Sequence, residues 1–309
     1  MADPPEQPEP TARDSPGATG FMSLGSEYVP PAVDELQQVL PHLEILQLIG
    51  HGGMGTFYQA RQSKLDRLVA LKVLPVDPDS DARLIAGFKR EARTMAGLSH
   101  PGIISIYDFG ETDSVLFLVM EFVHGDILER LIPEREFDLT QIINLVSQIC
   151  DALHYAHEQG VVHRDIRPGN TLLDDQGRVK VGDFGLARLV GEELFRRNLT
   201  MENRAMGTLD YVAPEQFETE ARVDHRADVY SVGMILYKLL THTLPHGGFV
   251  PPTELVPELD PRIDEVVIRA LQRDPDNRYQ GVAELWAEVQ ALVTEDPSGP
   301  RKPKFHFPD

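Results

Sequence analysis

A glycine-rich run near the N-terminal end of the chain has the spacing of a phosphate-binding turn. Its residues are Gly50, His51, Gly52, Gly53, Met54 and Gly55. Glycines allow backbone amides to close over phosphates because no Cβ stands in the way. A dinucleotide-binding turn needs a helix directly after the glycines, whereas residues 56–60 here are typical of another strand. The pattern therefore favours a strand–turn–strand over phosphate groups, and taken alone it also fits a simple glycine-rich hairpin.

A lysine lies within an apolar, strand-like segment that follows the glycine run. Lys72 ends the sequence Val-Ala-Leu-Lys within residues 68–74. A charged amine in such a segment is costly to bury unless it meets anions, such as phosphates or a carboxylate. Glu91, on a helix expected over residues 82–98, is the natural carboxylate partner. By themselves the two residues also fit an ordinary surface ion pair.

Three further motifs follow in order along the chain. Residues 163–170 read His-Arg-Asp-Ile-Arg-Pro-Gly-Asn, which places the carboxylate of Asp165 and the amide of Asn170 in one loop. Residues 183–185 read Asp-Phe-Gly, and residues 213–215 read Ala-Pro-Glu. With the glycine run and the strand lysine, these motifs make residues 43–292 resemble the protein kinase family. Within that family the residues of these motifs are most similar to those of the bacterial serine/threonine kinases.

The resemblance implies a role for each charged or amide side chain of these motifs. Lys72 would hold the α- and β-phosphates of ATP, with Glu91 fixing its position through an ion pair. Asp183 and Asn170 would bind Mg²⁺, with Mn²⁺ as an alternative ion, to neutralise charge on the transferred phosphoryl group. Asp165 would orient the substrate hydroxyl and accept its proton. The chemistry would then be mostly positioning and electrostatics.

The resemblance also implies an adenine pocket between two lobes. Backbone groups of Glu121 and Val123 would bind the base, and the glycine run would cover the phosphates. The side chains expected around the nucleotide are Ile49, Phe57, Ala70, Met120 and Leu172. Of these, Met120 would guard the back of the pocket.

Other residues of the resemblance are expected to be structural. A stack between the lobes would contain Met95, Ile106, His163 and Phe184, and Asp228 would anchor it. Glu215 would pair with Arg278 and tie the substrate-binding segment to the larger lobe. Thr208 would form a hydrogen bond near Asp165 and Arg167, which fits serine and threonine substrates rather than tyrosine.

Three positions depart from the usual pattern of the family. Arg167 stands where a lysine is usual. It keeps the positive charge and can reach the γ-phosphate, but its planar guanidinium group differs from the compact ammonium group of a lysine. Gly169 replaces a common glutamate, which is expected to weaken selection for basic residues on the substrate. Phe57 replaces a smaller valine and adds bulk to the roof of the pocket, where it would either stack on adenine or block it. We expect retuned activity rather than its loss.

Regulation can be predicted in outline. Arg164 directly precedes the catalytic aspartate, an arrangement that in this family pairs with a phosphate on the activation loop. Thr200 is the only hydroxyl amino acid between Gly185 and Gly207. We hypothesise that Thr200 is autophosphorylated and that its roughly −1.5 to −2 charges pair with Arg164. An unmodified, solvated threonine is the alternative.

The segments that position these residues predict an α+β, bilobal fold. A small β-rich N-lobe is expected over residues 43–123 and a larger helical C-lobe over 124–292. Strands are expected at 43–49, 56–60, 68–74, 103–109 and 116–122, and helices at 82–98, 139–158, 229–240, 263–271 and 282–292. Residues 1–42 are expected to be a mostly disordered, proline-rich acidic segment with a short helix near 32–40, and residues 293–309 a flexible tail.

Composition limits the classes of partner. The chain of 309 residues carries 49 acidic and 29 basic side chains, for a formal net charge of −20. This balance argues against nucleic acid as the main partner, because nucleic acid requires a basic footprint. The single cysteine, Cys150, excludes an intrachain disulfide framework and is expected in the core. Neither a membrane span nor a secretory signal is expected, and the location predicted is cytoplasmic.

The sequence therefore predicts an ATP-dependent serine/threonine protein kinase that acts on protein hydroxyls and phosphorylates itself. A pseudokinase, which binds nucleotide or protein partners without efficient transfer, is the first alternative. A small-molecule kinase of related fold is the second, although such kinases generally lack the Ala-Pro-Glu segment. The substrate, the activating signal and the oligomeric state are left open.

Overall fold

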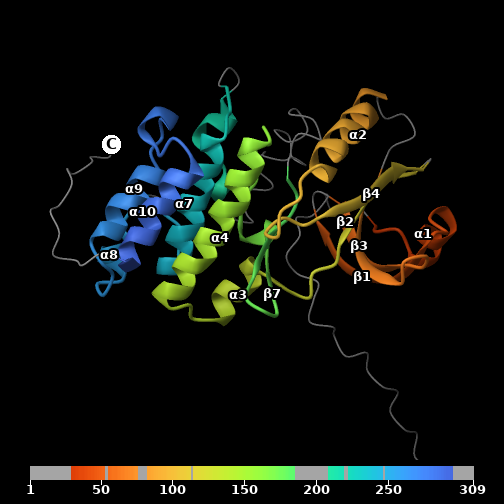
Figure 1. Cartoon of the computed structure of the whole chain (residues 1–309), viewed down its shortest axis with the longest axis horizontal. Helices are drawn as coiled ribbons and strands as arrows, with labels where there is room; N and C mark the ends of the chain where they lie inside the picture. Colours follow the sequence, from red (N-terminus) through yellow and green to blue (C-terminus); the bar gives the residue numbers. More distant parts are fainter. Residues whose placement is uncertain are drawn as a thin grey trace, which may run out of the picture.

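The computed structural model has two lobes, a β-rich N-lobe and a helical C-lobe (Figure 1). The residues that the structure describes are 29–52, 55–75, 82–112, 114–184, 208–218, 222–245 and 248–294. The expectations for residues 1–28 and for most of the tail fall outside these ranges. The predicted bilobal α+β class is confirmed.

The N-lobe is built on an antiparallel sheet with strand order β1-β2-β3-β5-β4. The strands are β1 (Leu43–Gly52), β2 (Gly55–Gln62), β3 (Arg67–Pro75), β4 (Ile106–Glu111) and β5 (Val115–Glu121). Side chains alternate between the two faces of a strand. On β3, Val69, Leu71 and Val73 pack in one apolar cluster, while Ala70 packs in the other, which continues into the C-lobe. Lys72 shares the strand face of Ala70 and is therefore directed toward the inter-lobe side.

A short helix, α1 (Val33–Val39), covers the face of the sheet that points away from the C-lobe (Figure 1). Leu36 and Leu40 are each 1% exposed and pack in the cluster of β1, β2, β3 and β5. Gln37 ties the helix to β1, donating to Leu43 O at 2.7 Å and accepting from Ile45 N at 2.9 Å. The lobe boundary expected at residue 43 leaves this helix outside, whereas its leucines belong to the N-lobe core.

The opposite face of the sheet carries α2 (Ala82–Ala96), which bears Glu91 (Figure 1). Phe88, Ala92 and Met95 are buried on one side of this helix and join the apolar cluster that links the lobes. Their spacing puts them on a single helical face.

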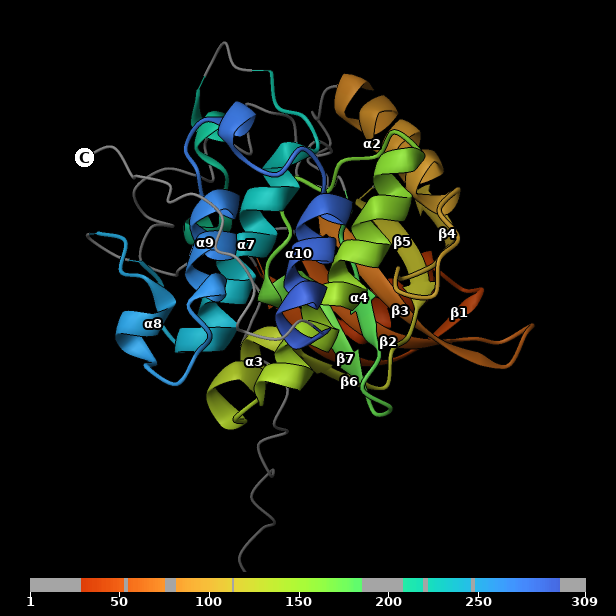
Figure 2. The same ribbon diagram turned by 60° about the vertical axis from the view of Figure 1, so that its left-hand side comes forward.

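The C-lobe is organised around α4 (Leu139–Glu158) and α7 (Arg226–Thr241), which lie side by side with α10 (Val282–Thr294) in both views (Figure 2). Asp138 starts α4 by accepting a hydrogen bond from Gln141 N at 2.8 Å. Cys150 is fully buried in α4, as expected, and burial raises the pKa of its thiol. The described part of this lobe also contains the α-helices α3 (Leu128–Glu134), α8 (Pro252–Leu255) and α9 (Arg262–Ala270).

A second, small antiparallel sheet lies where the lobes meet. Its strand order is β6-β7-β8, formed by β6 (Gly125–Ile127), β7 (Thr171–Asp174) and β8 (Val179–Val181). The short helix η1 (Pro168–Asn170) leads directly into β7, and β8 ends just before Asp183. This sheet therefore holds the two predicted metal-binding residues at neighbouring strand ends. Its strands are too short to be predicted from their periodicity.

The expected strand 103–109 is shorter in the structure. Ile103 forms only an isolated bridge to Val181, and β4 begins at Ile106. Ile103 thereby links the N-lobe segment to β8 instead of extending the sheet. Within the described residues, no helix is long and apolar enough to cross a membrane.

Candidate active site

The loop of residues 163–170 brings Asp165 and Asn170 into direct contact. Asn170 Nδ2 donates to both the backbone oxygen and Oδ2 of Asp165, each at 2.8 Å. Both side chains are 5% exposed. The turn closes through Asn170 N, which donates to Arg167 O at 3.0 Å, and Pro168 starts η1 there. A carboxylate is thus held in place by an amide from its own loop.

The surroundings of Asp165 set its proton affinity. Burial raises its pKa above the ordinary value and outweighs the opposing effects of Arg167, His163 and Asn170, while Asp183 adds to the rise. A carboxylate with a raised pKa is a better proton acceptor once it is ionised. This arrangement suits a group that accepts a proton from a nearby hydroxyl.

Asp228, at the start of α7, fixes the backbone just before Asp165. Its Oδ2 accepts from His163 N at 2.9 Å and from His157 Nε2 at 2.7 Å, and its Oδ1 accepts from Arg164 N at 2.7 Å. Arg164 has a φ of 67°, in the left-handed region that a non-glycine residue adopts only when its surroundings impose it. Asp228 is fully buried, and although burial acts in the opposite direction, hydrogen bonding and charge from His157 and His163 hold its pKa below the ordinary value. Asp228 is therefore a structural anchor.

His163 is a packing residue. Asp165 N lies 3.3 Å from its Nδ1, and its Nε2 lies 2.9 Å from Gly182 O. The first contact makes Nδ1 an acceptor, so Nε2 carries the proton and donates to Gly182 O. The ring also lies 4.5 Å from the ring of Phe184. Met95, Ile106, Met120 and Phe184 line one small cavity between the lobes, where the stack is expected from the sequence.

Lys72 and Asp183 meet across the two lobes. Lys72 Nζ lies 2.9 Å from Asp183 Oδ2, and the two side chains are 0% and 12% exposed. Asp183 has a φ of 59°, a strained backbone that costs about 1–3 kcal/mol and is common in functional sites. From the sequence, Glu91 is the expected partner of Lys72. In the structure Lys72 pairs with Asp183 instead, and Glu91 Oε1 lies 3.7 Å from Arg90 Nε.

The glycine run forms the hairpin expected from the sequence. Gly50 pairs with Phe57, His51 with Thr56 and Gly52 with Gly55 across β1 and β2. Gly55 has a φ of 121°, and a Cβ there would lie 2.6 Å from Val73 O, so the site requires glycine. The predicted residues Gly53 and Met54 lie outside the described residues.

Phe57 lies against the buried lysine. The two residues are cross-strand partners on β2 and β3, and Lys72 Nζ lies 4.8 Å from the centre of the Phe57 ring. Phe57 is 9% exposed. The ring thus contacts the residue expected at the phosphates, in addition to any contact with adenine.

The segment that joins the lobes starts at the end of β5. Glu121 N donates to Ser105 O at 2.9 Å, and Glu121 Oε1 pairs with Lys180 Nζ at 2.6 Å. Val123 follows and is partly buried. The other residues expected around adenine lie on β1 (Ile49), β3 (Ala70), β5 (Met120) and β7 (Leu172). They therefore come from both lobes on either side of this segment.

The residues present fit a nucleotide with a divalent ion. Lys72 Nζ is buried and makes no well-aligned hydrogen bond within the described ranges, so a phosphate oxygen can still bind it. Gly182 N donates to Asn170 O at 2.9 Å, which holds Asp183 next to the loop of Asn170. In the part of the chain that the structure describes, no three His, Cys, Asp or Glu side chains form a closed metal site. An ion here would need phosphate oxygens as further ligands, which is how Mg²⁺ is usually held.

Residues 43–285 match the model of the protein kinase domain family. The chain belongs to the protein kinase family. One relative, a probable serine/threonine-protein kinase of Streptomyces coelicolor, is 37% identical over 292 residues, covering 86% of this chain and 42% of the relative. Serine/threonine-protein kinase PknB of Mycobacterium tuberculosis is 34% identical over 280 residues, covering 84% of this chain and 44% of PknB. The chain spans less than half the length of these curated relatives.

Solved kinase structures share the fold. The crystal structure of the PknI kinase domain of Mycobacterium tuberculosis matches with a TM-score of 0.66 and 27% identity. The match covers 82% of this chain and 96% of that one. The chain thus contains a protein kinase domain.

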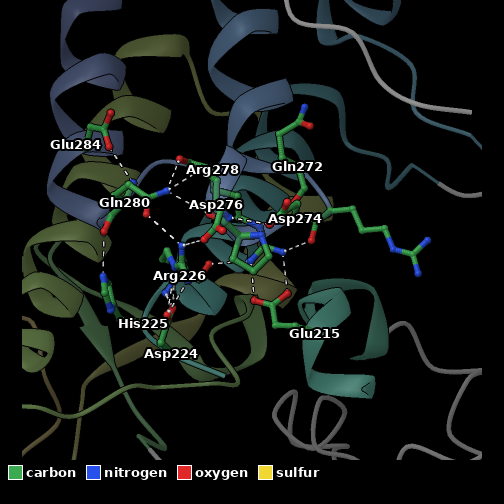
Figure 3. Close-up of polar contacts among 12 residues, drawn as sticks. Glu215, Asp224, His225, Arg226, Gln272, Asp274, Asp276, Arg278, Gln280 and Glu284 are labelled. Carbon is green, nitrogen blue, oxygen red and sulfur yellow. Dashed lines mark hydrogen bonds and ion pairs between the residues drawn. The ribbon is translucent and has the colours of Figure 1, made fainter. Parts of the chain in front are cut away.

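The kinase domain contains the Glu215–Arg278 pair, buried within a polar network (Figure 3). Arg278 Nη1 and Nη2 each donate to one carboxylate oxygen of Glu215 at 2.7 Å. Arg278 also donates to the backbone oxygens of Gln272, Arg226 and Arg273. The pair therefore joins η4 (Pro214–Phe217), which carries Glu215, to the start of α7 and to the segment before α10.

One contact of the kinase domain was not expected from the sequence. Gln216 Nε2 donates to Arg164 O at 2.8 Å, and Gln216 Oε1 accepts from Ala213 N at 3.2 Å. The side chain is 8% exposed and bridges η4 to the strained residue before Asp165. The sequence signal was only the glutamine of Ala-Pro-Glu-Gln, whose partner is 52 positions away.

The contacts above do not place two of the predicted residues, Thr200 and Thr208. Thr200 lies outside the described residues. Thr208 begins η3 (Thr208–Tyr211), and its side chain likewise lies outside the described part of the chain. Both stay predictions.

Proposed function

We propose that this chain transfers the γ-phosphoryl group of Mg-ATP to serine or threonine hydroxyls of proteins. The observation that carries the proposal is the Lys72–Asp183 ion pair of 2.9 Å between the lobes, beside the Asp165–Asn170 contact. The amine of Lys72 and the carboxylate of Asp183, our proposed phosphate-binding and metal-binding groups, thus lie beside Asp165, the proposed proton acceptor. The membership of the family and its serine/threonine kinase relatives support the same activity.

Each side chain has a separate task in the proposed transfer. Lys72 binds phosphate oxygens, and Asp165 orients the substrate hydroxyl and accepts its proton. Arg167 contributes a second positive charge next to Asp165, its Nε lying 3.9 Å from Asp165 Oδ2. Asp183 and Asn170 hold the divalent ion, which when bound supplies charge neutralisation on the phosphates. We propose Mg²⁺ as this ion and the cytoplasm, which supplies ATP, as the compartment.

The adenine base is proposed to lie next to the segment that joins the lobes. Backbone groups of Glu121 and Val123 bind the base, and Ala70 and Leu172 cover it from the two lobes. Gly50, Gly52 and Gly55 bring backbone amides over the phosphates. Phe57 packs against Lys72, and we propose that its extra bulk is tolerated.

The test is transfer of labelled γ-phosphate from Mg-ATP to a generic basic protein and to the chain itself. Asp165→Asn is the matched control because it keeps the shape of the side chain and removes the charge. Incorporation that the variant reduces at least about 100-fold is the expected result. Equal incorporation by both proteins contradicts the proposal. ATP binding without any incorporation by the parent points instead to a pseudokinase.

Autophosphorylation is proposed at Thr200. Mapping the labelled residue in the same experiment identifies the acceptor, and Thr200→Ala should remove that label and lower the activity toward the added protein. Labelling at another residue, or unchanged activity and unchanged label in Thr200→Ala, contradicts this assignment. Mn²⁺ in place of Mg²⁺ tests the choice of ion.

A further inference from the structure

Arg167 is buried next to the catalytic aspartate, with one end of its guanidinium still available. The residue is 3% exposed. Its Nε is buried, lies 3.9 Å from Asp165 Oδ2 and has no hydrogen-bond partner among the described residues. A buried donor without an acceptor is costly, so this nitrogen is suited to an acceptor that arrives with the substrate.

Gly169 leaves the space that the guanidinium fills. A Cβ at this position would overlap Arg167 Nη1, and it would lie 2.9 Å from both Arg167 Cζ and Glu129 Oε2. The backbone of Gly169 does not lie in the left-handed region, so the glycine is required for space and not for its conformation. Any larger residue would have to displace the side chain of Arg167 because both lie in a buried loop.

Glu129, on α3, faces the outer end of the same guanidinium. Its Oε1 lies 3.5 Å from Arg167 Nη1. Burial raises the pKa of Glu129, with the charge of Arg167 acting in the opposite direction and that of Asp165 in the same direction. The arginine therefore lies between two carboxylates, with Asp165 on its Nε side and Glu129 on its Nη1 side.

We infer that Gly169 and Glu129 are positioning residues that allow an arginine to serve at position 167. This inference rests on the proposed function. Gly169 provides the room for the planar fork, and Glu129 holds Nη1, so that Nε is directed at the phosphoryl group beside Asp165. The departures from the family pattern at positions 167 and 169 are then one coupled change, instead of two independent substitutions that each weaken the function of the site.

The coupling follows from the shapes of the two cations. An arginine ends in a rigid, planar fork, whereas a lysine ends in a single ammonium group on a flexible stem. A lysine has no Nη1 atom at the place where a Cβ of residue 169 would lie. Replacing Arg167 by lysine should therefore remove the need for glycine at 169.

The test is a double-mutant cycle on the full chain, with kcat and the KM for ATP measured for Gly169→Ala, Arg167→Lys and the double variant. We expect Gly169→Ala alone to lower kcat at least about tenfold with the KM for ATP within about twofold, because a small displacement of a positioned group is costly. In the Arg167→Lys background the same alanine should change kcat less than about twofold. Glu129→Gln should lower kcat about threefold or more in the parent and have no effect in the Arg167→Lys background.

Two matched controls separate positioning from general damage. Gly281→Ala changes a glycine whose added Cβ would meet nothing within 4 Å, and Glu134→Gln changes an exposed glutamate of the same α3 helix. Both should keep kcat within twofold of the parent. The inference is overturned if Gly169→Ala keeps parental kcat, or if its loss is as large in the Arg167→Lys background as in the parent.

Thermal unfolding of the parent, Gly169→Ala, Arg167→Lys and the double variant distinguishes a failure of the proposed function from a failure of this inference. If the parent itself transfers no phosphate, the proposed function fails and the catalytic part of the inference fails with it. The steric part is then decided by the melting temperatures. Gly169→Ala should lower the melting temperature of the parent but not that of Arg167→Lys, and equal shifts in both backgrounds contradict the coupling.

Discussion

Arg278 and Glu215 are 63 positions apart in the sequence, yet they bind each other through two hydrogen bonds of 2.7 Å in the interior of the C-lobe. Arg278 is 1% exposed and Glu215 is 7% exposed. A planar guanidinium matches both oxygens of a carboxylate, so the pair fixes orientation as well as distance. The Ala-Pro-Glu segment is thereby fixed in relation to the start of α7 and to the segment that precedes α10.

Removing one member of this pair should destabilise the fold strongly. Arg278→Gln leaves the carboxylate of Glu215 buried without its partner, which costs about 3 kcal/mol or more. The free energy of unfolding in urea measures the loss. Arg61→Gln is the matched control, because Arg61 pairs with Asp66 at the same 2.7 Å but the side chains are 41% and 83% exposed. That variant should lose at most about 1 kcal/mol. Similar losses in the two variants would contradict the role of the buried pair.

Gln216 should act on catalysis through the loop that carries Asp165. In Gln216→Glu the side chain can still accept from Ala213 N, but it cannot donate to Arg164 O. The strained backbone at Arg164 then keeps the hydrogen bond from its N–H to Asp228 but loses the one at its carbonyl oxygen, and we expect kcat to fall about tenfold while the KM for ATP changes less than about twofold. Steady-state kinetics with the basic protein substrate measure both constants.

Gln148→Glu is the control for that prediction. Gln148 likewise bridges two backbone groups, accepting from Val179 N at 2.9 Å and donating to Gly177 O at 3.4 Å, at the turn between β7 and β8. It should lower the stability by a similar amount and leave kcat within twofold. A parallel fall of kcat in both variants would show that Gln216 acts only through stability.

The sequence could predict the parts of the fold and of the site that depend on local pattern. The apolar periodicity of residues 139–158 gave the bounds of α4, and the glycines of the run led to a hairpin because a strand-like segment follows them. The motif residues Asp165 and Asn170 are five positions apart in one loop, so their contact follows from their spacing.

Contacts between distant segments were less predictable, because spacing along the chain does not fix them. The ion pair of Lys72 with Asp183 depends on how the two lobes meet, and the bridge from Gln216 to Arg164 depends on the path of the Ala-Pro-Glu segment. Helix α1 was expected as an isolated segment, since nothing in residues 32–40 says that Leu36 and Leu40 pack on the sheet. The space that Gly169 leaves for Arg167 likewise depends on the three-dimensional arrangement of their loop.

Phe57 should tune the binding of ATP through Lys72. Phe57→Leu keeps an apolar side chain but removes the aromatic face 4.8 Å from Lys72 Nζ, an interaction worth about 0.5–2 kcal/mol. We expect the KM for ATP to change about threefold or more. Tyr107→Leu is the control, because Tyr107 stacks on Arg67 at 3.6 Å but is 39% exposed and lies on β4. An unchanged KM in Phe57→Leu, or an equal change in both variants, would contradict this role.

Burying the carboxylate of Asp165 imposes a cost on the stability of the fold. Burial, the largest cause, raises the pKa of Asp165 above its ordinary value of 3.8. The folded state therefore binds this proton more tightly than the unfolded state does, and stability falls as the pH rises from below 3.8 through the raised pKa. Asp165→Asn removes the charge and should raise the melting temperature at neutral pH by about 2 °C, the shift that roughly 1 kcal/mol gives in a domain of this size.

The pH dependence of that difference is the deciding measurement. The advantage of Asp165→Asn should shrink toward zero as the pH is lowered to about 4, because the parent carboxyl is then protonated as well. Asp174→Asn provides the opposite sign: although burial acts against it, hydrogen bonds from Arg178 and Gln176 lower the pKa of Asp174. That variant should be less stable than the parent at neutral pH, and its deficit should fade only as the pH falls through the lowered pKa. An Asp165→Asn variant that is less stable than the parent at pH 7 would mean that the hydrogen bonds of Asp165 outweigh the effect of its burial, and that this carboxylate stabilises the loop it occupies.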